Sequence, residues 1–319
     1  MRKLLYCLII SIILISSFAA CTTEKPVDFA IQVYTRSDAC GAAETWAKYL
    51  DNRKQEDLKG IAVFGDPGLA EAVARDSLGI GYNNIGFAYN TNTGEQLTGL
   101  CVIPIDLNEN GTIDASENFY EKKSTLVKAI SEGHYPSPPA RDLHLVTQSE
   151  FKGISREFVR WILTDGQKYV DEMGYVNLTE EKIKQGLDKL GQSGHDIPMK
   201  GIITISGAWA LYPMVVRWAE EFQNIYPNIR IDVSAGGAGK GMVDALSGMV
   251  DLGMISRGIY TEEIEKGAFW ISVVKDAVVP VTSSSNPFLK DIVNNGLKKQ
   301  TFIDIWITGN ISDWKSAIQ

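Results

Sequence analysis

The sequence is poor in cysteine and histidine, with 4 and 3 of these residues among 319. Four cysteines are too few for a disulfide framework. The histidines His134, His144 and His195 show neither catalytic nor zinc-binding spacing, and the chain lacks a nucleophile elbow and an ordered Ser, His and Asp set. These absences predict that the protein is not an enzyme.

Long basic runs, internal repeats and low-complexity segments are also missing from the sequence. The 31 Lys and Arg residues against 39 Asp and Glu give a net charge of −8, so nucleic acid is not an expected partner. With 45% hydrophobic and 22% charged residues, the composition is that of a globular protein and excludes collagen-like, disordered and coiled-coil classes. The length predicts two domains.

Residues 1–20 have the order of a secretory signal peptide, with basic residues at positions 2 and 3 and an apolar stretch over 4–18. This stretch is short for a membrane-spanning helix, which needs about 20 residues. Residues 18–21 resemble the bacterial lipobox, which implies lipidation of Cys21 and a lipidated linker over 21–28. The lipid would tether the protein to a membrane in the cell envelope, in the periplasm or on the outer face of the cytoplasmic membrane. An uncleaved anchor, or a plain signal with a chance cysteine, is the alternative.

Alternating apolar patterns predict an α/β protein with a largely parallel core. Helices are expected over 42–50, 154–173, 211–226 and 241–248, because their apolar residues recur at helical spacing. Strands are expected over 31–34, 79–82, 101–105, 202–205, 229–233 and 250–254. Residues 190–199 are the best candidate for a linker between two halves.

One loop, over 36–43, joins a predicted strand to a predicted helix and could hold an anion. Gly41 and the neighbouring alanines allow backbone N–H groups at the helix start to approach a ligand. Arg36 could add a two-pronged contact to an oxyanion. The alternative interpretation is a tight turn in which Arg36 pairs with Asp38.

Two further loops have the same character. Residues 234–241 hold four glycines before a helix, with Lys240 as a point charge, but match neither a P-loop nor a dinucleotide fingerprint. In the loop over 206–213, Ala210 and Leu211 would donate backbone N–H groups. Ser256-Arg257 adds a hydroxyl group and a cation after strand 250–254, so the loops together predict an oxyanion site at strand ends.

Residues 106–117 fit the calcium-loop pattern D-x-[DN]-x-[DN]-G-x5-E at every position. Gly111 provides the sharp turn, and Ile113 is an apolar residue that could pack inward. No partner loop is visible, so a bound Ca²⁺ ion would be structural, and an Asn- and Gly-rich surface turn is the alternative. The expected oxygen ligands are Asp106, Asn108, Asn110, Thr112, Asp114 and Glu117.

Several segments resemble the phosphate-binding proteins of ABC-type phosphate transporters. The loop over 36–41 is similar to their Arg-x-Asp-x-Ser-Gly-Thr motif, and the resemblance covers nearly all of 29–319. It implies a two-lobed, type II periplasmic-binding-protein-like fold, with a hinge and a ligand cleft between the lobes. The other matching segments are 80–82, 135–141, 164–175, 207–213, 218–222, 236–241, 250–257 and 306–314.

The order of these segments differs from that of the family. Members begin with the part found here at 200–319, so the chain resembles a circular permutant rejoined through 190–199. A rearranged or wrongly assembled gene is the alternative. On this template, lobe one comprises 136–278, and lobe two comprises 29–135 together with 279–319.

The binding loops carry fewer hydroxyl groups than is usual in the family. In the first loop, Cys40 and Ala42 stand at positions where Ser and Thr are common in the family. In the second loop, Ala238 and Lys240 also stand where Ser and Thr are common. At a helix start, the thiol of Cys40 could have a lowered pKa, but Cys40 is expected to be a small residue that lines the cleft. A disulfide between Cys40 and Cys101 is a further alternative. The implied ligand-binding residues are Arg36, Cys40, Gly41, Ala42, Ala210, Leu211, Ala238, Gly239, Lys240, Ser256 and Arg257.

The resemblance implies a monomeric, extracytoplasmic lipoprotein that captures inorganic phosphate for an ABC transporter permease. Backbone N–H donors survive any side-chain substitution, whereas the loss of hydroxyl groups alters selectivity. Another oxyanion, such as sulfate, molybdate or tungstate, is therefore an alternative ligand. A calcium-stabilised surface lipoprotein without a transport role is the alternative from a different functional class.

Overall fold

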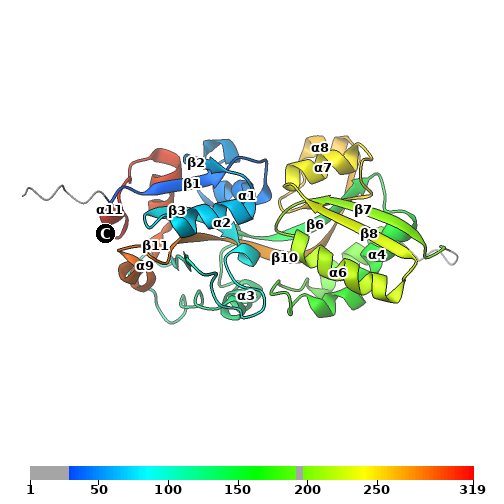
Figure 1. Cartoon of the computed structure of the whole chain (residues 1–319), viewed down its shortest axis with the longest axis horizontal. Helices are drawn as coiled ribbons and strands as arrows, with labels where there is room; N and C mark the ends of the chain where they lie inside the picture. Colours follow the sequence, from blue (N-terminus) through cyan, green and yellow to red (C-terminus); the bar gives the residue numbers. More distant parts are fainter. Residues whose placement is uncertain (1–28, 192–196) are drawn as a thin grey trace, which may run out of the picture.

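A computed structural model describes residues 29–191 and 197–319, which form two lobes lying side by side (Figure 1). Two long antiparallel strands, β6 (Ala140–Gln148) and β10 (Ala268–Ser283), connect the lobes. From residue 29 the chain runs through lobe two, enters lobe one along β6, and returns to lobe two along β10. Both crossings lie in one continuous sheet, so β6 and β10 form the hinge between the lobes.

Lobe two contains the first part of the chain and its C-terminal part. Its helices are α1 (Gly41–Tyr49), α2 (Gly65–Arg75), α3 (Lys123–Glu132), α9 (Leu289–Asn295), α10 (Lys299–Ile303) and α11 (Trp314–Ala317). Its strands are β2 (Ile61–Val63), β1 (Gln32–Arg36), β3 (Gly79–Asn84), the second half of β10, and β4 (Leu100–Val102), in sheet order. A separate parallel pair joins β5 (Ile105–Asp106) to β11 (Leu297–Lys298).

Lobe one contains the middle of the chain. From β10 the sheet continues through β6, β9 (Leu252–Ile255), β7 (Gly201–Gly207) and β8 (Ile229–Ala235). Its helices are α4 (Gly153–Leu163), α5 (Glu180–Leu190), α6 (Tyr212–Ile225), α7 (Ala238–Leu246) and α8 (Thr261–Glu265).

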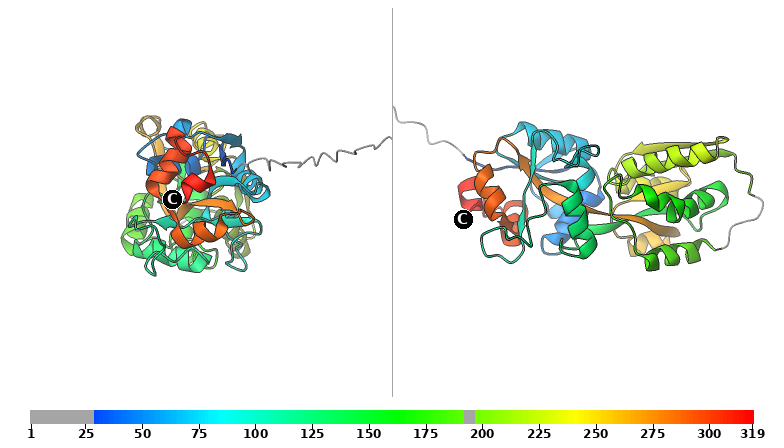
Figure 2. Two further views of the ribbon diagram at one scale, coloured as in Figure 1. Left: turned by 90° about the vertical axis from the view of Figure 1, so that its left-hand side faces the viewer. Right: turned by 90° about the horizontal axis from the view of Figure 1, so that it is seen from below.

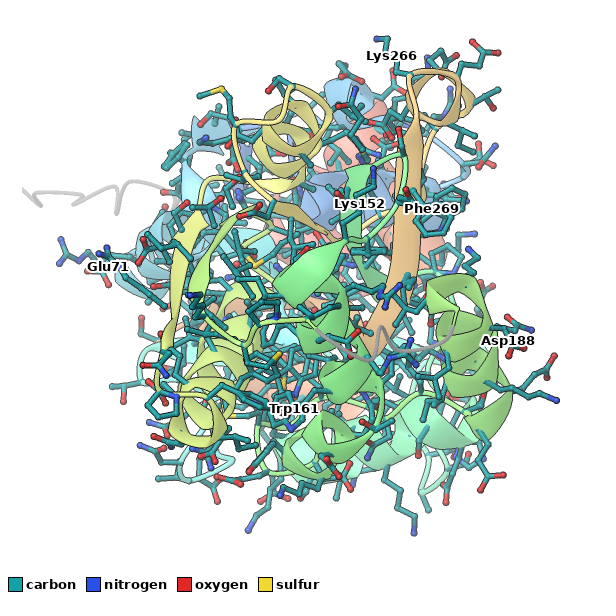
Figure 3. The ribbon with its side chains drawn as sticks, turned by 90° about the vertical axis from the view of Figure 1, so that its right-hand side faces the viewer. Glu71, Lys152, Trp161, Asp188, Lys266 and Phe269 are labelled. Atoms are coloured by element: carbon teal, nitrogen blue, oxygen red, sulfur yellow. The ribbon has the colours of Figure 1, made fainter. Side chains whose placement is uncertain are left out.

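Each lobe has its own hydrophobic core. In lobe two, buried Trp46 packs against Phe302 and Trp306 with ring centroids 5.3 and 5.5 Å apart. In lobe one, Phe222 packs edge-on against Trp161 at 5.5 Å. Figure 3 looks at the end of lobe one, where Trp161 lies among the helices and Lys152 projects outward. Because the chain crosses between the two cores within β6 and β10, the lobes can move as separate bodies.

The structure corrects two sequence-based expectations about local structure. The sheet is mixed rather than largely parallel, because β6 and β10 run antiparallel to their neighbours at its centre. The expected helix over 154–173 ends at Leu163 and is followed by a 3₁₀ segment, Asp165–Tyr169. This break is fixed from α6, since Trp218 Nε1 donates to the Gly166 carbonyl at 2.8 Å.

The two ends of the described chain meet in lobe two. Ile31 N donates to the Ser312 carbonyl at 2.8 Å, and Trp314 N donates to the Phe29 carbonyl at 3.0 Å. Figure 2 shows the C-terminus at the end of lobe two that is remote from lobe one. Within 29–191 and 197–319, every helix falls short of the length and apolarity needed to cross a bilayer.

Candidate anion-binding site

The start of α1 touches the end of β9 across the two lobes. Gly41 is the first residue of α1, and Ser256 directly follows β9. A Cβ atom on Gly41 would lie 2.2 Å from both the carbonyl oxygen and the Oγ of Ser256, so only glycine permits this approach. Two of the segments expected to bind an anion therefore meet where the lobes join.

The start of α7 packs against the same loop of lobe two. Gly239 N donates to the Ala39 carbonyl at 3.1 Å. Gly237 has a φ of 92°, and a Cβ there would come within 2.9 Å of Asp38 Oδ2, so this position favours glycine for two reasons. Figure 1 shows α1 and α7 facing each other at the junction of the lobes.

The third loop reaches the junction through an aromatic contact. Trp209 of lobe one meets Phe64 of lobe two edge-on, with ring centroids 6.3 Å apart. Ala210 is buried, and its carbonyl accepts a hydrogen bond from the Tyr175 hydroxyl at 2.7 Å. All three loops singled out in the sequence therefore lie along one interface between the lobes.

Arg36 is buried in this interface and bonded to two carboxylates. Its Nε and Nη2 donate to the two oxygens of Asp38 at 2.8 and 2.6 Å, and its Nη1 donates to Asp66 at 2.5 Å. Burial favours a lower pKa for the Arg36 guanidinium, but attraction to Asp66, and then to Asp38, raises the pKa above its ordinary value. The pairing with Asp38 is the alternative considered from the sequence. Arg36 keeps its positive charge, but the carboxylates of Asp38 and Asp66 already balance that charge.

A second arginine, Arg141 at the start of β6, joins the cluster. Its Nη1 donates to the Gly41 carbonyl at 3.2 Å, and its Nη2 donates to the Asn84 side chain. Arg141 Nε is buried without a hydrogen-bond partner. Burial lowers the pKa of Arg141 and raises the pKa of nearby Asp276 to about 7. Arg141 thus brings an unused donor to the centre of the junction.

Sequence analysis alone does not predict Asp66 or Arg141 as residues of the site. Asp66 lies in the first turn of α2, where an acidic residue usually indicates only a favourable helix start. Arg141 belongs to segment 135–141, which draws attention only through its resemblance to the family. Their contacts with Arg36 and Gly41 span 30 and 100 residues, and no local pattern encodes such pairs.

Lys240 and Arg257, two side chains expected to bind the anion, form ion pairs with carboxylates. Lys240 is half-exposed and pairs with Asp244 one helical turn further along α7. Arg257 donates to both carboxylate oxygens of Glu263, at 2.9 and 2.6 Å, and its guanidinium lies 4.0 Å from the centre of the Tyr260 ring. In this structure each of these side chains is paired with a carboxylate of its own lobe, so their contact with an anion stays a prediction.

Several expected donors have a protein partner instead. Leu211 N donates to the Ala208 carbonyl at 3.1 Å, so it is not free for a ligand. Cys40 caps α1, because its Sγ accepts from Ala43 N at 3.4 Å, and its own N–H donates to Gln55. The residues Ala42 and Ala238, each in the first turn of a helix, are buried.

The structure shows neither of the two alternatives considered for the Cys40 thiol, a lowered pKa and a disulfide. Burial raises the pKa of Cys40 to about 12, which outweighs the lowering by nearby Arg36. Cys40 and Cys101 are both buried free thiols, so they form no disulfide with each other. Cys40 therefore acts as a small buried residue of the junction.

Comparison with known proteins identifies the family. A model of the PBP superfamily domain matches residues 22–166 and 173–319. Over 194 residues the chain is 25% identical to the phosphate-binding protein PstS 2 of Streptococcus agalactiae serotype V, covering 60% of each chain. Over 119 residues it is 36% identical to the phosphate-binding protein PstS of Bacillus subtilis, covering 36% of this chain and 37% of that one. The chain thus matches less than two thirds of the length of these curated relatives.

A solved structure gives the same architecture. The phosphate-binding protein of a phosphate ABC transporter from Streptococcus pneumoniae TIGR4 superposes with a TM-score of 0.57 at 18% identity, covering 90% of this chain and 99% of that one. The expected two-lobed α/β fold is confirmed. These relatives are named as binding proteins, in agreement with the expectation that the chain is not an enzyme. Since the family model matches nearly all of the described residues, the chain belongs to the PBP superfamily.

Proposed function

We propose that the protein is an extracytoplasmic binding protein that captures inorganic phosphate for an ABC importer. The observation that carries this proposal is the contact of Gly41 with Ser256 across the lobes. When the lobes open about β6 and β10, the first turn of α1 and the Ser256 hydroxyl would face a common space. Helix starts favour anions, and the curated relatives are phosphate-binding proteins by name.

The buried charges support a ligand that is both anionic and protonated. Arg36 and Arg141 supply positive charge, and Arg141 Nε is an unused buried donor. Asp38 lies at the interface, where its carboxylate could accept a hydrogen bond from a protonated phosphate oxygen. A fully deprotonated oxyanion such as sulfate would meet that carboxylate with no proton to offer.

A surface lipoprotein without anion transport is the second candidate. It is favoured by the pairing of Arg36 with both Asp38 and Asp66, and by the Gly239 N–H that donates to Ala39. These contacts satisfy the groups that a ligand would need. Sulfate, molybdate and tungstate remain alternative ligands of the first candidate.

The cell-envelope location is part of the same proposal. The expected signal over 1–20 and the lipidation of Cys21 lie outside the described residues. A monomer tethered through Cys21 would deliver its ligand to a membrane permease. The meeting of the two described ends in lobe two supports the proposed circular permutation, because chain ends close in space tolerate being joined.

The test uses the protein without residues 1–21, which leaves every described element in place. Its thermal midpoint is measured with phosphate, sulfate, molybdate and tungstate, since a ligand at 100 times its dissociation constant adds about 2.7 kcal/mol. A shift with phosphate alone supports the proposal. A shift with another oxyanion would make that oxyanion the ligand. If none of the oxyanions shifts the midpoint, the second candidate is favoured.

A matched pair of variants locates the site. In Gly41→Ala, the new methyl group would collide with Ser256 and hold the lobes apart, so the phosphate shift should disappear. Gly258→Ala changes a nearby glycine with nothing within 4 Å of the new Cβ, and should keep the shift. Equal phosphate shifts in both variants would remove the junction from the binding site.

A further inference from the structure

We propose that residues 106–117 of lobe two bind one Ca²⁺ ion, and that this ion fastens the loop to the C-terminal segment of the lobe. This site is separate from the candidate anion site. The loop follows β5 and lies beside β11, near the end of the chain.

Two carboxylates of the loop are buried without a cationic partner. Asp106 is 1% exposed and Glu117 is 4% exposed. Asp106 Oδ1 is buried and has no hydrogen-bond partner. In the described parts of the chain, neither carboxylate forms a salt bridge with Lys or Arg. Backbone N–H groups are the partners of Glu117, whereas the buried Asp106 Oδ1 has none, and a buried negative charge without a cation favours a bound cation.

Hydrogen bonds hold the first and last carboxylates of the loop close to the same backbone. Gly111 N donates to Asp106 Oδ2 at 2.8 Å, which leaves Oδ1 unused. Leu107 N and Asn108 N donate to Glu117 Oε1 at 2.8 and 3.0 Å, so the last carboxylate is folded back to the start of the loop. Gly111 has a φ of 83°, the conformation that this sharp turn requires.

The remaining expected ligands converge in the same way. The side-chain amides of Asn108 and Asn110 both donate to Asp114 Oδ2, at 2.8 and 3.0 Å. Thr112 N donates to Asn110 Oδ1 at 2.9 Å. The side chains of Asn108, Asn110 and Asp114 are therefore joined to one another within the loop.

The chemistry of this oxygen set favours calcium. Ca²⁺ takes six to eight oxygen ligands in flexible geometry, whereas Mg²⁺ requires a nearly ideal octahedron and dehydrates reluctantly. Across the residues that the structure describes, no three His, Cys, Asp or Glu side chains already meet as metal ligands. Calcium would thus draw Glu117 from backbone N–H groups onto the ion, with Asn side chains and the Thr112 carbonyl completing the shell.

The loop is anchored to the C-terminal segment and not to a second calcium loop. Ile113 N donates to the Asn294 carbonyl at 2.8 Å, at the end of α9. A Cβ on Gly296 would lie 2.5 Å from Ile113 Cδ1, so the two segments are in tight contact. An ion in the loop would therefore stabilise lobe two by holding β5, α9 and β11 together.

The experiment uses the chelator-treated protein without residues 1–21, in phosphate-free buffer, titrated with CaCl₂ or with MgCl₂ alone. We expect CaCl₂ to raise the thermal midpoint and to slow amide exchange over 105–119 and 294–298, with MgCl₂ much weaker at equal concentration. The absence of any calcium effect up to several millimolar, roughly the weak limit for extracellular calcium sites, would overturn the proposal.

Two variants, each of which replaces one glutamate by glutamine, test whether calcium binds in this loop. Glu117→Gln removes the last carboxylate ligand and should weaken calcium binding at least about tenfold, because affinity in such loops follows the ligand charge. Glu109→Gln removes an exposed charge at a non-ligand position and should bind calcium as the parent does. Equal losses in both variants would show surface attraction instead of a site. If Glu117→Gln does not fold, the calcium titration of the parent protein still decides the proposal.

Discussion

Arg141 Nη1 donates to the Gly41 carbonyl at 3.2 Å, which links the first residues of the connecting strand β6 to the start of α1. The same guanidinium reaches the Asn84 side chain at the end of β3. One side chain at the hinge therefore holds two of the elements that border the candidate anion site. Arg141 thus ties the start of a connecting strand to the helix start of lobe two.

Replacing Arg141 by Lys should lower the free energy of unfolding by about 2 kcal/mol, because lysine lacks the planar fork that reaches both acceptors. Urea denaturation measures the change. Arg75→Lys is the matched control, since the Arg75 side chain is 80% exposed and its pairing with Glu71 contributes little. Similar losses in the two variants would contradict the role given to Arg141.

Asp38 should control the choice between phosphate and sulfate. In Asp38→Asn the amide offers N–H donors where the carboxylate repels a fully ionised anion, so sulfate affinity should rise at least about tenfold relative to phosphate affinity, or about 1.4 kcal/mol. Calorimetric titration with both anions measures the ratio. Asp232→Asn, on the partly exposed surface of β8, should leave it unchanged. An unchanged ratio in Asp38→Asn would argue against contact between Asp38 and the ligand.

Asp276 should make the protein less stable as the pH rises from about 4 to 7. Burial raises the pKa of Asp276 to about 7, so between the unfolded and folded pKa values the folded chain holds a proton that the unfolded chain has lost. Thermal midpoints across this range measure the pH dependence, and the Asp276 contribution to it should be absent from Asp276→Asn.

Comparing the parent protein with Asp276→Asn also separates the effect of Asp276 from the titration of His144. Burial lowers the pKa of His144 to about 4, which makes stability rise with pH between about 4 and 6.5. Lys123, whose pKa burial lowers to about 8, stays protonated over most of the range. The His144 pKa is set by burial and by charges other than Asp276, so its contribution is the same in both proteins and cancels in the difference. A difference that does not change with pH would contradict the prediction.

The sequence predicted the loops of the candidate site but not its charge balance. Glycines and alanines between a strand and a helix are a local pattern, and Gly41 and Gly239 lie where that pattern predicts close contact. Asp66 and Arg141 act through partners far along the chain. The pairing that neutralises Arg36 therefore became visible only in the folded structure.

The same distinction applies to the fold. Helices such as α6 have a clear apolar stripe and were predicted within a few residues. The 16-residue strand β10 was missed, because it is buried along much of its length and shows no polar alternation. Since β10 supplies the antiparallel centre of the sheet, missing it also made the sheet seem parallel.

The proposed permutation predicts that the reverse arrangement also folds. A chain that starts at 197, runs to 319, continues through a short flexible linker to 29 and ends at 191 would keep every described element. The join spans ends that already pair, since Ile31 bonds to Ser312 and Trp314 bonds to Phe29. The cut falls between α5 and β7.

A short linker between ends that already lie together costs little chain entropy, so the thermal midpoint of the rearranged chain should stay within about 5 °C of the parent. Its response to phosphate should be the same, because the loops around Gly41 and Ser256 are untouched. Circular dichroism during heating, with and without phosphate, measures both properties. A rearranged chain that does not fold would mean that the present order is needed to assemble the hinge strands, and that the chain is not a simple permutant.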